Sequence, residues 1–119
     1  MHRYQIIIEY DGTNLYGFQI QKKGNTVQKL VQSTISKILK EKIKIISSSR
    51  TDAGVHAWGQ SAHFDCRKKI LSKDKFIKSL NFFLNKKNVS ITKLIKRNSN
   101  FNARYSAKDR IYEYIIINR

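Results

Sequence analysis

The sequence predicts an α+β fold in which two helices cover one face of a mostly antiparallel sheet. β-branched and aromatic runs alternate with two segments whose apolar residues follow helical spacing. The resulting order is strand, helix, strand, strand, helix, strand, strand, as in the ferredoxin-like sandwich that RNA-recognition modules also adopt. With 119 residues and no internal repeat or low-complexity linker, residues 1–119 are expected to form a single domain.

Five segments are predicted as strands because they are rich in β-branched and aromatic residues and end at polar or turn-forming residues. They are residues 4–10, 43–46, 60–65, 89–95 and 111–117. The last run is apolar on both faces. We therefore expect a partner surface or further sequence to cover one of them.

Two amphipathic helices are predicted between these strands. The first begins after Asn25 or Thr26, either of which can cap it, and ends near Lys40. The second begins after Ser72 and ends at residues 85–88. Its predicted apolar face contains Phe76, Ile77, Leu80, Phe83 and Leu84.

The charge balance favours a polyanionic partner, since 24 Lys and Arg stand against 8 Asp and Glu, for a net charge of +16. Nucleic acid is favoured over an anionic membrane because the lysines are spread along the chain rather than gathered in one amphipathic helix. Coding bias is the alternative source of so many lysines. No apolar stretch approaches the length needed to cross a bilayer.

Cys66 is the single cysteine, so the chain has no internal disulfide and no multi-cysteine zinc site. This usage is typical of a reducing compartment, and we expect the cytoplasm or an organelle interior. His56 and His63 stand seven positions apart, a spacing that matches no common zinc site. We expect no metal and no other cofactor.

Residues 50–56 contain the groups best suited to chemistry. Arg50 and Asp52 share one face of an extended segment, and a neighbouring guanidinium favours the ionised carboxylate that a nucleophile requires. Taken alone, such a pair on a loop is more often a surface ion pair or a turn-capping motif.

A family resemblance covers nearly the whole chain. The run Ser-Arg-Thr-Asp-Ala-Gly-Val-His-Ala at residues 49–57 resembles the catalytic motif of the tRNA pseudouridine synthase A family, which has Gly in place of Ser49. Further similar segments follow in the family's order, at residues 8–13, 16–19, 26–28, 59–60, 63–64, 101–107 and 112–114. Asn102 is a departure, since the family often has His there.

The resemblance implies an enzyme that isomerises uridine to pseudouridine in the anticodon arm of tRNA, without cofactor or metal. It implies that Asp52 is the catalytic carboxylate, attacking either C6 of the base or C1′ of the sugar. Arg50 would orient Asp52, and Tyr112 would stack on the flipped base and assist removal of the C5 proton.

The remaining candidates are tRNA contacts. Tyr10 and Phe18 are candidates for base stacking, as is Phe64, although each of these is more often a core residue. His56 is expected to cap a turn or touch phosphate. The candidate phosphate contacts are six basic residues: Lys22, Lys23, Arg67, Lys68, Lys69 and Arg104. Gln19 and Gln60 lie in segments that resemble the family, and complete the predicted substrate-binding set.

Family members carry a second domain of similar size, and their active site lies between the two halves. We therefore expect this chain to resemble the N-terminal, catalytic-aspartate half, completed by a homodimer or by a separate chain. Two other functions stay open: a catalytically silent basic RNA-binding module, and a small ribosome-associated structural protein in which Asp52 has no special role.

Overall fold

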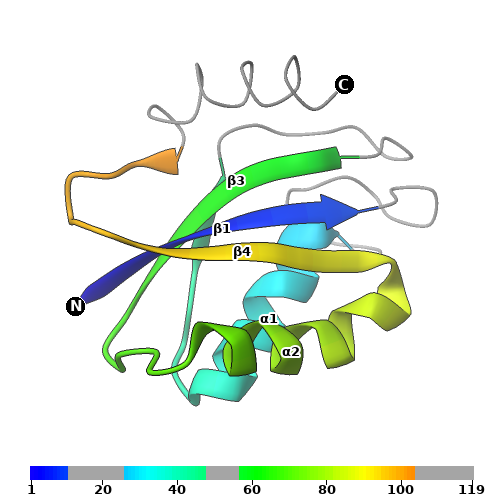
Figure 1. Cartoon of the computed structure of the whole chain (residues 1–119), viewed down its shortest axis with the longest axis horizontal. Helices are drawn as coiled ribbons and strands as arrows, with labels where there is room; N and C mark the ends of the chain where they lie inside the picture. The colour runs from blue at the N-terminus through cyan, green and yellow to red at the C-terminus, as the bar shows by residue number, and fades with distance from the viewer. Residues whose placement is uncertain (11–25, 48–56, 104–119) are drawn as a thin grey trace.

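The computed structural model describes residues 1–10, 26–47 and 57–103. Two helices lie against one face of a four-stranded sheet, which confirms the predicted α+β class and fits a ferredoxin-like arrangement (Figure 1). The strand order is β2-β3-β1-β4, and every neighbouring pair is antiparallel. The predicted strand at residues 111–117 lies outside the described residues.

Strand β1 (His2–Tyr10) is central and pairs with both β3 (Ala57–Cys66) and β4 (Val89–Arg97). Its residues alternate between the two faces, as strand geometry requires. Tyr4, Ile6 and Ile8 point to the helices and are at most 1% exposed. The helix-covered face of β1 therefore forms the centre of the hydrophobic core.

Helix α1 (Val27–Leu39) begins after Thr26, as the sequence predicts. The Thr26 hydroxyl accepts a hydrogen bond from the backbone N–H of Lys29 at 3.2 Å, which satisfies one of the unpaired donors at the helix start. The helix ends at Lys40, which adopts a left-handed conformation with φ 56°. Its buried stripe contains Val27, Val31, Ile35 and Leu39.

Helix α2 (Lys73–Leu84) begins after Ser72, which caps the backbone N–H of Lys75 in the predicted way. Leu80 and Leu84 are buried, as expected. The prediction was wrong for Phe83, which is 41% exposed. The ring lies at the border of the apolar stripe, where Lys37 of α1 places its Nζ 5.3 Å from the ring centroid.

The strand predictions differ from the structure at their ends. Strand β2 (Ile45–Ser47) begins two residues later than predicted, and the backbone N–H of Ile43 instead donates to the Ser36 hydroxyl in α1. Strands β3 and β4 are longer than predicted because pairing with β1 continues past their apolar runs. A short 3-10 helix, η1 (Asn85–Lys87), joins α2 to β4.

The three aromatic side chains that the structure describes in the strands belong to the core: Tyr4, Tyr10 and Phe64. These three rings are therefore buried on the side of the helices, and none of them is exposed on the helix-free face, where a base could stack. None of the helices in the described part of the chain is long and apolar enough to cross a membrane.

Candidate functional site

The predicted catalytic motif directly precedes β3 in the sequence, and β3 begins at one end of the sheet. Asp52 precedes Ala57 by five positions in the sequence, and Ala57, the first residue of β3, pairs with Tyr10, the last residue of β1. Six predicted site residues are described: Tyr10, Gln60, Phe64, Arg67, Lys68 and Lys69. The other nine lie outside the described residues: Lys22, Lys23, Phe18, Gln19, Arg50, Asp52, His56, Arg104 and Tyr112.

The structure brings Tyr10 and Gln60 together. The Tyr10 hydroxyl donates a hydrogen bond to Oε1 of Gln60 at 3.1 Å, and each residue is 5% exposed. A hydrogen-bonded partner is what a buried phenol and a buried amide require. This contact ties the end of β1 to β3 close to the point where the chain enters from residue 56. Their roles as RNA contacts stay predictions.

Two bulges distort the sheet at this same end. Between Ile8 and Glu9 of β1, strand β3 carries the extra residue Gly59, whose φ of 95° suits glycine. On the other side of β1, strand β4 carries the extra residue Thr92, whose hydroxyl donates to the carbonyl of Ile7 at 3.3 Å. Bulges re-aim the side chains beyond them, and they are common next to active sites.

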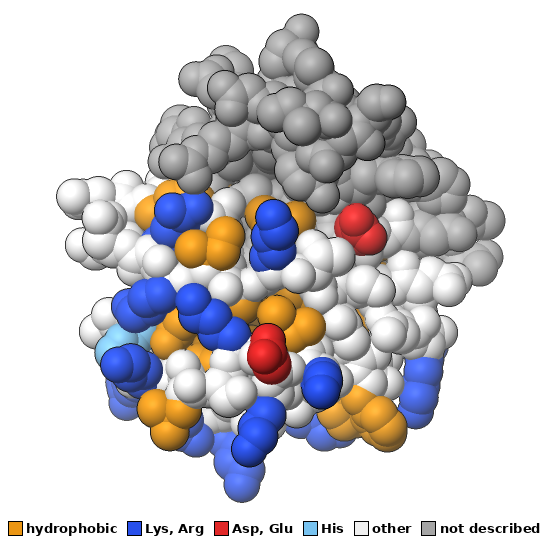
Figure 2. Space-filling view, in the orientation of Figure 1, with side chains coloured by type: hydrophobic (Ala, Val, Ile, Leu, Met, Phe, Trp, Pro, Cys, Tyr) orange, Lys and Arg blue, Asp and Glu red, His pale blue; other side chains and the backbone are white. Residues whose placement is uncertain are grey.

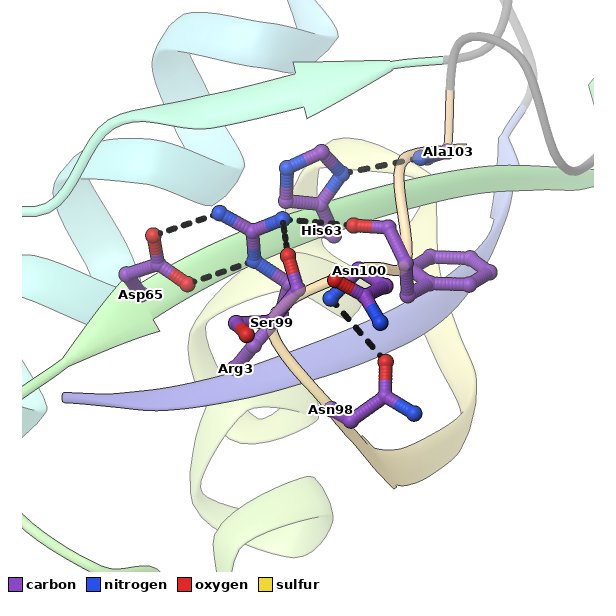
Figure 3. A network of polar contacts seen from close by, with 8 residues as sticks. Arg3, His63, Asp65, Asn98, Ser99, Asn100 and Ala103 are labelled. Carbon is purple, nitrogen blue, oxygen red and sulfur yellow. Dashed lines mark hydrogen bonds and ion pairs between the residues drawn. The ribbon is translucent and has the colours of Figure 1, made fainter.

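The helix-free face carries a polar network that the sequence analysis missed (Figure 3). Arg3 of β1 pairs with Asp65 of β3 in the strand register and binds its carboxylate through two nitrogens, at 2.8 and 2.9 Å. Hydrogen bonding to Arg3 lowers the pKa of Asp65, and the same bond raises the pKa of Arg3. The remaining guanidinium nitrogen donates to the carbonyls of Ser99 and Phe101.

A second row of this network joins β4, β1 and β3. Nε of Arg97 donates to Oε1 of Gln5 at 2.8 Å, and Nε2 of Gln5 donates to the Ser61 hydroxyl at 2.7 Å. Gln5 and Ser61 are 5% and 1% exposed, so their partners compensate for lost contacts with water. The Arg97 guanidinium also lies 5.0 Å from the centroid of the Phe101 ring.

His63 completes the attachment of residues 98–103 to the sheet. Its Nδ1 accepts a hydrogen bond from the backbone N–H of Ala103 at 3.0 Å, and its ring contacts Phe101 edge-on at 5.9 Å. Burial, followed by the positive charge of Arg3, lowers the pKa of His63, so the imidazole is neutral and its Nδ1 remains an acceptor. Ala103 directly precedes Arg104, one of the predicted phosphate contacts.

One sequence signal points to this network. Arg3 and Gln5 alternate with Tyr4 and Ile6 along β1, and an alternating polar residue marks the face away from the core. That pattern identifies the face but not the partners. Among the residues described, no group of three or more His, Cys, Asp or Glu is arranged to hold a metal ion.

Comparison with known proteins identifies the family. A family model described as tRNA pseudouridine synthase matches residues 6–106, which include the motif at residues 49–57. The chain belongs to this family. The match extends from β1 through all the described elements of the fold.

Individual family members are similar along the whole chain. The tRNA pseudouridine synthase A of Pelagibacter ubique is 58% identical over 119 residues, covering 100% of this chain and 48% of the relative. The enzyme of the same name from Phytoplasma mali is 45% identical over 113 residues, covering 94% of this chain and 46% of the relative. The chain thus spans about half the length of the curated relatives it matches, and corresponds to their N-terminal part.

Proposed function

We propose that the chain forms the N-terminal, catalytic part of a tRNA pseudouridine synthase that acts on uridine in the anticodon arm. The observation that carries this proposal is the run at residues 49–57 within a chain 58% identical to a tRNA pseudouridine synthase A. The reaction takes place where tRNA is found, in the cytoplasm or an organelle interior.

Asp52 is the nucleophile in this proposal. Its carboxylate attacks the target nucleotide, at C6 of the base or at C1′ of the sugar, and the bond between N1 and C1′ breaks. The uracil then turns so that C5 joins C1′, the C5 proton leaves to solvent, N1 takes up a proton in exchange, and the carboxylate is released. No atom is gained or lost overall, so the reaction needs no oxidant or second substrate.

Arg50 holds the Asp52 carboxylate ionised and oriented, because a neighbouring positive charge lowers the pKa of a carboxyl group. Tyr112 stacks on the extruded base and assists removal of the C5 proton. A base that reacts at its glycosidic bond must leave the helical stack, and an aromatic face together with a cation compensates for that loss.

The described residues support this proposal at the end of the sheet near Tyr10. The Tyr10 to Gln60 hydrogen bond and the bulges at Gly59 and Thr92 lie at the end of the sheet where β3 begins, and β3 directly follows the motif in the sequence. Catalytic groups are held accurately when rigid elements carry the loops on which they lie.

The test uses a chimaera in which residues 1–119 are followed by the remainder of the Pelagibacter ubique relative. Its substrate is tRNA tritiated at C5 of uridine, and tritium released to water reports the reaction. We expect release by the chimaera and at least a thousandfold slower release by its Asp52→Asn variant, since a missing nucleophile removes the covalent step. An Asp52→Asn variant as active as the parent would overturn the assignment.

A matched control separates the carboxylate from the general charge of the surface. Asp74 is an exposed acid in the first turn of α2. Asp74→Asn removes the same charge as Asp52→Asn and is expected to leave the rate of tritium release unchanged. The 119-residue chain is assayed beside the chimaera. tRNA binding by the chain, combined with no release by the chimaera, favours the alternative of a silent RNA-binding module.

A further inference from the structure

Positive charges gather at the end of the sheet opposite to Tyr10. His2, the first residue of β1, pairs with Cys66 at the end of β3, and three basic residues, Arg67, Lys68 and Lys69, follow directly. On the other side of β1, Lys96 of β4 pairs with Tyr4. Figure 2 shows Lys and Arg side chains around a histidine on the side where Figure 1 places the N-terminus.

Lys69, Lys96 and the N-terminal amine all lie close enough to His2 to influence its pKa. Burial lowers the pKa of His2, and the positive charges of Lys96, the N-terminal amine and Lys69 lower it further. We call His2, Lys69 and Lys96 the basic patch. Like charges held this close raise the local positive potential, which an anionic ligand relieves.

The acidic groups at this end are already engaged. Asp65 binds the Arg3 guanidinium, and the Glu41 carboxylate accepts hydrogen bonds from the backbone N–H groups of Arg67 and Lys68 at 2.8 and 3.1 Å. Across the described part of the chain, no carboxylate forms an ion pair with Lys69 or Lys96. Lys96 Nζ lies 5.3 Å from the centroid of the Tyr4 ring, but a ring face takes up none of its N–H donors. Because both lysines are exposed, their ammonium groups can donate to an anionic ligand.

The basic patch is remote from the proposed reaction centre. Strand β1 rises about 3.3 Å per residue, so His2 lies roughly 26 Å along the strand from Tyr10. A single nucleotide does not reach across that distance, whereas a folded tRNA does. A ligand that meets both ends of β1 at once must be an extended polyanion.

We propose that the basic patch is an RNA-binding site, in which Lys69 and Lys96 contact phosphates of the tRNA at a distance from the target uridine. The proposed function enters only in naming tRNA as the polyanion. A membrane is disfavoured because the large apolar side chains exposed in this part of the sequence, Met1 and Leu71, are isolated residues rather than one face of an amphipathic helix.

The experiment compares two double variants of the 119-residue chain that lose the same charge. Lys69→Gln with Lys96→Gln alters the basic patch, and Lys75→Gln with Lys78→Gln alters exposed lysines of α2. Fluorescence anisotropy measures the affinity of each for labelled tRNA between 0.05 and about 0.3 M salt. Thermal unfolding followed by circular dichroism verifies that both variants fold like the parent.

Each phosphate contact contributes roughly 0.7 to 0.9 to the slope of log affinity against log salt. Loss of two contacts in the patch variant therefore reduces this slope by about 1.4 to 1.8. If parent and variant bind equally at 1 M salt, extrapolation to 0.1 M gives the variant a roughly 25- to 60-fold lower affinity than the parent. The α2 variant is expected to keep the slope of the parent. If both variants lose the same amount of tRNA affinity, the lysines contribute only to nonspecific electrostatic attraction, and the proposed site is wrong.

Further measurements separate this site from other partners and from the proposed function. Vesicles of phosphatidylcholine with phosphatidylserine are the membrane probe, and a patch variant that loses vesicle binding but keeps tRNA affinity overturns the proposal. In the chimaera, the patch variant is expected to raise KM with kcat unchanged. A chimaera that releases no tritium refutes the proposed function, while a patch-specific loss of tRNA affinity still supports the site.

Discussion

The buried imidazole of His63 gives a sharp test of how residues 98–103 are attached to the helix-free face. His63 is 2% exposed, and its Nδ1 is the acceptor for the backbone N–H of Ala103. His63→Leu leaves that donor without an acceptor, which lowers the free energy of unfolding by about 1–3 kcal/mol. His63→Asn places an amide oxygen near the position of Nδ1, so it is expected to cost less.

The pH dependence follows from the lowered pKa of His63. Below the ordinary histidine pKa of 6.5 the unfolded chain binds a proton that folded His63 does not, so the free energy of unfolding falls as the pH decreases from there. The slope approaches about 1.4 kcal/mol per pH unit between the unfolded and folded pKa values. About one pH unit or more above 6.5 the imidazole is nearly all neutral in both states and contributes almost no slope.

Urea unfolding at pH 7.5, 6.5, 5.5 and 5.0 measures both effects. The difference between the parent and His63→Asn isolates the titration of this residue, because the other titrating groups are common to both proteins. His2→Gln is the control at pH 7.5, where both imidazoles are neutral. His2 lies at the strand end and its side chain accepts no described backbone hydrogen bond, so this variant is expected to unfold like the parent. A difference between parent and His63→Asn that stays constant from pH 7.5 to 5.0 would refute the reasoning.

Two predictions concern the helices. Leu80→Ala removes a fully buried side chain of α2 and is expected to lower the free energy of unfolding by about 2–5 kcal/mol in urea, while Phe82→Ser, at a 65% exposed position, changes it by less than about 0.5 kcal/mol. Similar losses in both variants would contradict the position of the core. Thr26→Ala removes the cap on Lys29 and is expected to cost about 1 kcal/mol, with faster amide exchange confined to the first turn of α1. Uniformly faster exchange would argue against a local cap.

The helices were predictable because their signals are local. The caps at Thr26 and Ser72 act within three residues, and the apolar residues recur at the helical period. Phe83 is the exception, because exposure at the border of an apolar stripe depends on how closely the neighbouring helix approaches. Lys37 of α1, 46 positions earlier in the sequence, lies over its ring.

The ends of the strands were harder to predict because hydrogen bonding between strands decides them. Ser47 belongs to β2 because it pairs with Ala62, although its side chain carries no strand signal. The bulge at Thr92 is likewise invisible in the sequence, since it depends on the register between β4 and β1. Gly59 offered a clue, because glycine within a strand often marks a bulge.

The sequence by itself determined the family, through the motif around Asp52, and the fold class, through the order and periodicity of its elements. Tertiary structure alone decided the partners on the helix-free face. Arg3 meets Asp65 across 62 positions and the carbonyl of Phe101 across 98, and His63 meets Ala103 across 40. The physical reason is that a residue's type fixes which bonds it can make, whereas strand register and packing decide which distant group is within reach.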